Sequence, residues 1–465
     1  MDNFNIEDYH DLVKKQKSYS GRNENQSYKE RLDRLKRLKR ILVEKEGSWM
    51  EALNRDLGKS PIESYTSELA LLLNEIDTVT QKLNKWMKPK KSTHISLSGV
   101  AKSVLRPQPY GSILVLSPWN YPLQLTLMPV IGALAAGNSC VIKPSEFASA
   151  TAKLLADSVK EYFKPEEVTV IEGDSRVAES LLTLDWDFIF FTGSKRVGKI
   201  VHQAAAEKQI PVVLELGGKN PCIVDETGLS KETIRQIIWG KFVNAGQTCI
   251  APDTIYVHES IYTDFLTEAA ECIEAFYGKD PEKSPDYSRI IHQEQFKKQI
   301  SFLNQGTVYH GGRYNLAERY VEPTILVDLA EESAMMKEEI FGPIMPVISY
   351  SSIQELTKEL NQQPVPLAAY VFSENQDTIR YLEKEIRSSA FSLNQVIRHA
   401  AHAEIPFGGL KESGFGSYHG LTSFETFSFQ KVFYEQKNKK SLSQQYPPYR
   451  SKQLDLLRKF RKKLF

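Results

Sequence analysis

Short apolar runs rich in β-branched and aromatic residues alternate with longer amphipathic runs between about residues 112 and 215. The apolar runs, each the length of a strand, are 112–117, 139–143, 168–172, 188–192 and 211–215. The runs between them, such as 147–163 and 196–208, have helical spacing. This alternation predicts a doubly wound α/β sheet of parallel strands, which binds ligands at the carboxyl ends of its strands. The residues at those ends are Asn120, Lys143, Gly193 and Glu215.

The same pattern predicts further elements on either side of this region. A second α/β segment is expected from near Asn220 to about 400, with PCIVD, TIYVH and LAAYVF as strands. Residues 92–106 alternate like a hairpin around Ser98-Gly99, and with 420–435 they predict a β-element that reaches a partner chain. Residues 27–56 are expected to form one long surface helix. Acidic residues dilute its KRLKR cluster, which favours a solvated helix face over nucleic-acid binding.

Composition is ordinary for a globular protein, with 465 residues, 41% apolar and 25% charged residues, enough for two or three domains. Four cysteines without CxxC spacing predict neither a disulfide framework nor a metal site, and nine histidines show no zinc spacing. The N-terminus has no signal-peptide pattern. We therefore expect a reduced, cytoplasmic protein without a metal.

Two stretches raise the question of a membrane. Residues 107–142 carry no charged residue or histidine, but Pro118, Pro122 and Pro129 divide them, which favours buried strand, turn and helix over a membrane span. Residues 437–465 hold ten Lys or Arg and one Asp, although the whole chain has a net charge of +1. Within 450–465, Leu454, Leu457, Phe460 and Leu464 lie at helical spacing. This tail is either a peripheral membrane contact or a surface segment, exposed or packed on another subunit.

Glu215 opens the run ELGGKNP, and Cys249 closes the run NAGQTC. A cysteine can attack a carbonyl carbon, and a carboxylate can activate the water that opens the resulting thioester. The other cysteines, Cys140, Cys222 and Cys272, lie within strand or helix runs and are expected to be packing residues.

The run GSKRVGK (193–199) nearly spells a P-loop, but Ile200 follows it where magnesium binding needs a hydroxyl. What remains is a glycine turn at a helix N-terminus, which suits a diphosphate. A P-loop nucleotide-binding protein stays an alternative.

A series of motifs in order along residues 5–440 resembles the aldehyde dehydrogenase superfamily: PWNYP, KPSE, FTGSKRVGK, the Glu215 and Cys249 runs, EEIFGPI and PFGGLKESGFGSYHG. The YHG and SFETFS that follow are similar to its class 3 branch, which includes fatty aldehyde dehydrogenases. The resemblance implies an aldehyde dehydrogenase-like α/β fold and a typically dimeric enzyme. It also implies NAD(P)-dependent oxidation of an aldehyde, aliphatic and including long-chain substrates, to a carboxylic acid. A non-enzymatic relative, as among lens crystallins, is the other alternative.

The resemblance assigns site residues one by one. Cys249 would be the nucleophile that forms a thiohemiacetal and a thioester, Glu215 the base for hydrolysis, and Asn120 the oxyanion donor. The residues implied to bind the cofactor are Lys143, Glu146, Gly193, Ser194, Gly198, Glu339 and Phe341. The Glu146 carboxylate favours NAD, while Lys195 and Arg196 leave NADP open. His399 and His402 are expected at a rim or in solvent.

The implied domains follow from the same match. The dinucleotide-binding domain would comprise 1–90 and 108–214, and the catalytic domain 215–400. The oligomerisation element would comprise 91–107 and 415–436, and the basic tail 437–465.

Overall fold

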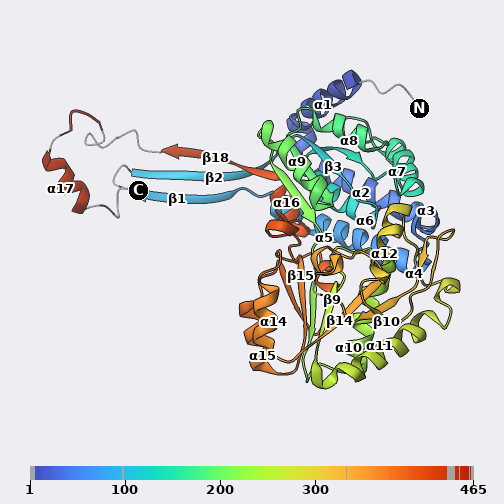
Figure 1. The fold of residues 1–465 in the computed structure, drawn as a ribbon. Helices are drawn as coiled ribbons and strands as arrows, with labels where there is room; N and C mark the ends of the chain where they lie inside the picture. Colours follow the sequence, from blue (N-terminus) through green and yellow to red (C-terminus); the bar gives the residue numbers. More distant parts are fainter. Residues whose placement is uncertain are drawn as a thin grey trace.

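Two open sheets flanked by helices make up the body of the protein, and a three-stranded arm extends from it (Figure 1). The computed structural model describes residues 6–96, 99–330, 332–436, 446–449, 451–459 and 461. The predicted α/β fold class is confirmed.

The first sheet has six strands among the described residues. Five of them run parallel to one another, and the sixth is an antiparallel edge strand. In spatial order the strands are β17 (Gly414–Phe415), β7 (Val212–Leu216), β6 (Phe188–Gly193), β3 (Ser112–Leu116), β4 (Ser139–Lys143) and β5 (Val168–Val170). The five predicted strands are therefore confirmed, and the antiparallel edge strand β17 is an addition. The chain order reverses between β3 and β6, and this switch point is where such sheets bind ligands.

Helices cover both faces of this sheet because residues along each strand alternate between two cores. Ile113 and Val115 of β3 pack into one core, and Leu114 and Leu116 pack into the other. The helices that pack around this sheet are α1 (Ile6–Ser20), α2 (Tyr28–Glu44), α5 (Ala70–Trp86), α6 (Gln124–Ala136), α7 (Ser149–Tyr162), α8 (Ser175–Leu182) and α9 (Lys195–Glu207). Every residue of α6 is buried, which confirms the expected strand, turn and helix in 107–142. No described helix is both long and apolar enough to cross a membrane.

The single long helix expected over 27–56 is wrong. The chain forms two helices, α2 and α3 (Glu46–Leu57), and leaves the helical conformation at Lys45. The break allows the buried Trp49 to lie against the preceding helix, where its indole N–H donates to the Ile41 carbonyl at 3.2 Å. The periodicity of each half is helical, so the pattern alone did not indicate the break.

The second sheet has seven strands. In spatial order they are β10 (Thr307–His310), β13 (Thr324–Val327), β14 (Ile344–Tyr350), β9 (Thr254–His258), β8 (Pro221–Val224), β15 (Ala368–Phe372) and β16 (Ala390–Leu393). All neighbours are parallel except β10 and β13. One face packs on α14 (Ile353–Leu360) and α15 (Gln376–Glu385), and the other on α10 (Lys231–Phe242) and α11 (Tyr262–Tyr277) (Figure 1). The three strands predicted here are confirmed.

The arm consists of β1 (Lys90–Ser96), β2 (Gly99–Pro109) and β18 (Ser428–Gln436), all antiparallel. The hairpin strands are confirmed, while Ser98 of the predicted turn lies outside the described residues. The expectation that 420–435 is wholly β is wrong, because Gly420–Thr426 form the helix α16, which packs on α5 and α6. The division into three domains stays a prediction.

The remaining elements are short or connect the two sheets. Besides several short 3-10 turns, they include α4 (Pro61–Ser64), the π-helical turn η2 (Tyr65–Leu69), α12 (Gln293–Leu303), α13 (Ala334–Lys337), β11 (Tyr314–Asn315), β12 (Tyr320–Val321) and α17 (Ser451–Lys459). In the basic tail, Leu454 of α17 is 52% exposed, and Phe460 and Leu464 lie outside the described residues.

Candidate active site

Cys249 follows a tight loop at the end of α10, in which consecutive residues adopt left-handed backbone conformations. Asn244 and Ala245 have φ values of 53° and 50°, and Gly246 has 73°. A side chain at Gly246 would meet the Gly342 carbonyl at 2.3 Å, so glycine is required for the two segments to approach. Cys249 keeps part of its surface accessible, whereas Cys140, Cys222 and Cys272 are buried in β4, β8 and α11, as predicted.

The environment of Cys249 keeps its sulfur protonated. Burial, followed by the charges of Glu339 and Glu215, raises the pKa of the thiol from 9.0 to about 12. The backbone N–H groups of Cys249 and Ile250 act in the opposite direction. These N–H groups are donors in place beside the reacting atom, as an oxyanion site needs.

Glu215 is the penultimate residue of β7 and is 3% exposed. Neither carboxyl oxygen has a hydrogen-bond partner among the described residues. Burial alone raises the pKa of Glu215 well above its ordinary value. Glu215 lies close enough to influence the pKa of Cys249. Because its pKa is raised, Glu215 is a stronger base in its ionised form than an exposed carboxylate.

Asn120 lies on the loop after β3 and is 3% exposed. Its side-chain amide donates to the Gln247 carbonyl at 3.0 Å, two residues before Cys249. The next residue, Tyr121, shares a hydrogen bond of 2.6 Å with the Thr248 hydroxyl. The structure therefore brings all three predicted catalytic residues to one place, although their roles stay predictions.

Four of the predicted cofactor residues lie at or just after the carboxyl ends of β4 and β6, and a fifth, Gly198, lies in the first turn of α9. Lys143 ends β4 and pairs with Glu146 at 2.9 Å. Gly193 ends β6, and the Ser194 hydroxyl caps α9 by accepting the Val197 N–H at 3.4 Å. A side chain at Gly198 would meet Leu216 at 2.7 Å, so this glycine lets α9 pack closely on β7.

The polar groups at this edge fit a dinucleotide. The hydroxyls of Ser117 and Thr192 are buried and have no partner among the described residues. Ser117 directly follows β3, and Thr192 lies near the end of β6. The helix α9 begins two residues after β6, and the free N–H groups at its amino end suit a diphosphate. The residues present therefore fit NAD(P).

Glu339 and Phe341 lie on the segment between α13 and β14. The Ile340 N–H between them donates to Asp253 at 2.9 Å. Burial, followed by the charge of Asp253, raises the pKa of Glu339 to about 8. Phe341 has a φ of 50°, and its ring lies edge-on to Trp119, with 5.3 Å between centroids. This segment therefore borders both Cys249 and the Asn120 loop.

The two histidines expected at a rim or in solvent differ in exposure, with His399 half-buried. His402 is exposed, but the His399 ring stacks on Phe407 with 6.3 Å between centroids, and burial lowers its pKa to about 4. His419, from the YHG run, also stacks on Phe407, with 5.6 Å between ring centroids, and burial lowers its pKa to about 4. The burial of His399 and His419 therefore follows from their contact with Phe407 and not from the composition of the loops that carry them.

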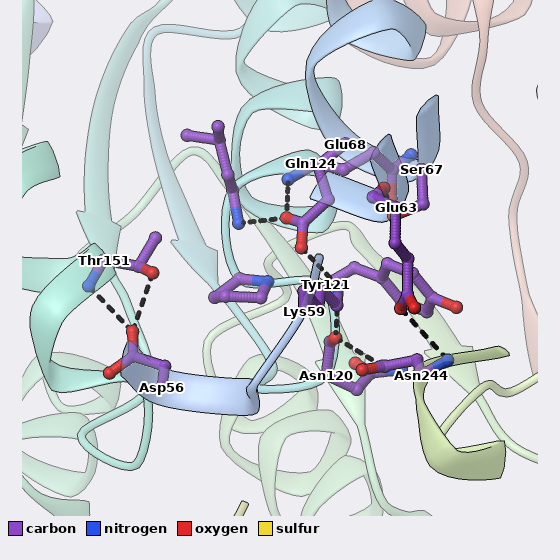
Figure 2. A network of polar contacts seen from close by, with 12 residues as sticks. Asp56, Lys59, Glu63, Ser67, Glu68, Asn120, Tyr121, Gln124, Thr151 and Asn244 are labelled. Carbon is purple, nitrogen blue, oxygen red and sulfur yellow. Dashed lines mark hydrogen bonds and ion pairs between the residues drawn. The ribbon is translucent and has the colours of Figure 1, made fainter. Parts of the chain in front are cut away.

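Sequence reasoning also missed three ionisable residues beside the site. Lys59, Glu63 and Glu68 lie between α3 and α5 and contact the Asn120 and Asn244 loops (Figure 2). The one sequence signal was two glutamates and a lysine close to Pro61, in a stretch that otherwise reads as an ordinary amphipathic helix.

Comparisons with known proteins show which family this chain resembles. The family model of the aldehyde dehydrogenase family matches residues 2–433. The 4,4'-diapolycopene-4,4'-dial dehydrogenase of Cytobacillus firmus is 49% identical over 405 residues, covering 87% of this chain and 89% of that protein. Aldehyde dehydrogenase family 3 member A2 of Macaca fascicularis is 39% identical over 439 residues, covering 93% and 90%. The substrate-bound structure of Staphylococcus aureus AldH has a TM-score of 0.94 and 37% identity, covering 98% of this chain and 100% of that chain.

Proposed function

This chain belongs to the aldehyde dehydrogenase family, in its class 3 branch, and we propose that it oxidises a long apolar aldehyde to a carboxylic acid through a thioester on Cys249. The family consists of oxidoreductases that act on the aldehyde group with NAD or NADP as acceptor. One observation carries the mechanism. Cys249 keeps accessible surface, while Glu215 acts on its pKa and Asn120 binds its loop.

Attack on the aldehyde requires Cys249 to lose its proton as the carbon–sulfur bond forms. The raised pKa of this thiol leaves little thiolate at neutral pH, so a nearby base must take the proton. Solvent at the partly exposed Cys249 takes this proton, because burial holds Glu215 itself in its protonated form before the reaction. The negative oxygen of the thiohemiacetal is then stabilised by the Asn120 amide and the Cys249 backbone N–H, and one such donor is worth about 3 kcal/mol.

The bound cofactor supplies the hydride acceptor. When it is bound, Lys143 and Glu146 would hold the adenosine ribose, the amino end of α9 with Gly193 and Ser194 would hold the diphosphate, and Glu339 would bind the second ribose. Phe341 would pack against the nicotinamide. Loss of hydride leaves a thioester on Cys249, and Glu215 deprotonates the water that releases the acid. We propose NAD as the preferred cofactor because the Glu146 carboxylate repels a 2′-phosphate.

The alternative function, a P-loop nucleotide-binding protein, is supported only by the glycines of 193–199. Ile200 offers no hydroxyl for magnesium, and these residues lie within the match to the aldehyde dehydrogenase family. The substrate proposal is supported by the Cytobacillus relative, whose name assigns it a carotenoid dialdehyde.

We further propose that the arm joins two chains in a homodimer. We also propose that the enzyme is cytoplasmic and that its residues 450–465 contact the membrane, where it meets lipid-like aldehydes.

The test is NADH production, read by absorbance, from NAD and aldehydes of increasing chain length. Cys249→Ala should abolish it while cofactor binding is retained, and Cys272→Ala, which changes a buried helix cysteine, is the matched control. Near-normal turnover of Cys249→Ala would contradict the proposal.

Glu215→Gln should stop the reaction at the acyl-enzyme, seen by mass spectrometry as an adduct on Cys249. Steady turnover without an adduct would remove Glu215 from the hydrolysis step.

A further inference from the structure

A buried ion pair lies directly behind the Asn120 loop. Lys59 and Glu68 are both 0% exposed and pair with each other. The Lys59 ammonium also donates to the Asn120 main-chain carbonyl at 3.2 Å and lies 4.0 Å from the centre of the Tyr121 ring. Its three contacts are therefore a carboxylate and two neighbouring residues of the catalytic loop (Figure 2).

Glu68 holds the other end of the same loop. One of its carboxyl oxygens accepts the backbone N–H groups of Leu123 at 2.8 Å and Gln124 at 3.1 Å. These groups begin α6, which has no side-chain cap of its own. A carboxylate at this position satisfies free N–H groups and interacts favourably with the helix dipole. Glu68 lies in η2, a π-helical turn of the kind that often occurs at functional sites.

The opposite side of the Asn120 carbonyl is held by the loop of the nucleophile. The Asn244 amide donates to this carbonyl at 2.7 Å and to the Gln247 carbonyl at 3.2 Å. The Asn244 backbone N–H in turn donates to Glu63 at 3.0 Å. The Asn120 carbonyl is thus fixed between Lys59 and Asn244 (Figure 2), while the Asn120 side chain donates to the Gln247 carbonyl, two residues before Cys249.

Stability alone gives no reason for this pair. Burying two charges costs several kcal/mol per ion, and apolar residues of similar size are often neutral or stabilising replacements. What an ion pair provides, and an apolar pair does not, is a fixed position for each donor and acceptor. An oxyanion donor needs such precision, because a displacement of about 1 Å can reduce turnover by about 100-fold.

We propose that Lys59 and Glu68 are positioning residues that hold the Asn120 amide at the oxyanion of the thiohemiacetal. They touch neither substrate nor cofactor and act through the Asn120 loop. This inference rests on the role proposed above for Asn120.

The test is the double variant Lys59→Met/Glu68→Gln. Met fills the space of the lysine stem, and Gln keeps an oxygen for the Leu123 and Gln124 amides without an unpaired charge. We expect kcat to fall at least ~10-fold with unchanged NADH affinity and thermal stability. The control Arg37→Met/Glu167→Gln removes a partly buried pair that contacts neither loop, and it should keep wild-type kcat.

A double-mutant cycle separates positioning from general damage. In an Asn120→Ala background the Lys59→Met/Glu68→Gln change should cost nothing further, because the group it positions is gone. An equal fold-loss in both backgrounds, or an unchanged kcat in the double variant, would overturn the inference. If the double variant does not fold, Lys59→Arg keeps the charge but moves the donors, and its loss of kcat must likewise vanish in Asn120→Ala.

The outcomes also separate this inference from the proposed function. A wild-type protein that makes no NADH from any aldehyde overturns both. Active wild type and impaired Asn120→Ala, together with wild-type kcat in the Lys59→Met/Glu68→Gln variant, overturn the positioning role alone.

Discussion

The variant Glu339→Gln should change the rate at which Cys249 is alkylated, and only above about pH 8. Burial raises the pKa of Glu339 to about 8, so its carboxyl is mostly neutral below that pH and charged above it. Once charged, it opposes formation of the Cys249 thiolate and is the largest cause of the raised thiol pKa after burial. The variant removes that charge, and the thiol should ionise more easily.

The size of the effect follows from the two pKa values. With a pKa of about 12 instead of 9.0, Cys249 at pH 8 is roughly 1 part thiolate in 10,000 instead of about 1 in 10. Alkylation of the ligand-free protein should therefore be slower than that of an ordinary thiol by at most ~1,000-fold, an upper limit because Cys249 is partly accessible. Removing one nearby like charge should recover about 10-fold of this at pH 9.5 and nothing at pH 6.5.

The assay is iodoacetamide modification from pH 6.5 to 9.5, followed by mass spectrometry of the Cys249 peptide in the ligand-free protein. Glu338→Gln is the matched control, because the neighbouring Glu338 is exposed and pairs with Lys298. The reasoning is refuted if wild-type Cys249 reacts as fast as an ordinary thiol at pH 8. It is also refuted if Glu339→Gln gives the same rate increase at both ends of the pH range.

Two further substitutions test buried or paired carboxyls. Burial raises the pKa of Glu75 to about 7, so its contribution to stability is complete below pH 4.5, falls as pH rises to 7 and stays low above it. Glu75→Gln keeps an acceptor for the Gly420 N–H. The variant should therefore gain up to about 3 kcal/mol of unfolding free energy at pH 8 and almost none at pH 4.5, measured by denaturant titration. An equal gain at both pH values would contradict this. Glu146→Gln should lower the ratio of kcat/KM with NAD to that with NADP, and an unchanged ratio would place the carboxylate away from the 2′ position.

The fold was largely predictable because its strands are short apolar runs with clear boundaries. Runs 139–143 and 254–258 agree with β4 and β9 residue for residue. The errors occurred where tertiary contacts decide the outcome. Trp49 packing against Ile41 breaks a continuous helical pattern, and Gly420–Thr426 becomes a helix because α5 and α6 offer it a surface. Neither contact is written in the local pattern.

The candidate site, like the fold, was predictable from the sequence only in part. Residues at strand ends and glycine turns, such as Glu215 and Gly193, were found because their sequence neighbours carry the signal. Lys59 and Glu68 were not, because their importance depends on contacts with residues 55 to 61 positions away in the chain. A lysine and a glutamate in an amphipathic stretch usually face solvent, and only the fold buries this pair.

Burial raises the pKa of each of the three ionisable groups around the reacting sulfur. Burial favours the protonated form of Cys249, Glu215 and Glu339 alike. Three negative charges in one buried site would repel one another strongly, so protonation removes that repulsion in the resting protein. The consequence is that the nucleophile is not present as a ready thiolate. Its proton has to leave during attack, and the oxyanion must be stabilised at the same moment. The position of the Asn120 amide, and hence of the ion pair behind it, therefore matters more here than it would beside a thiolate formed in advance.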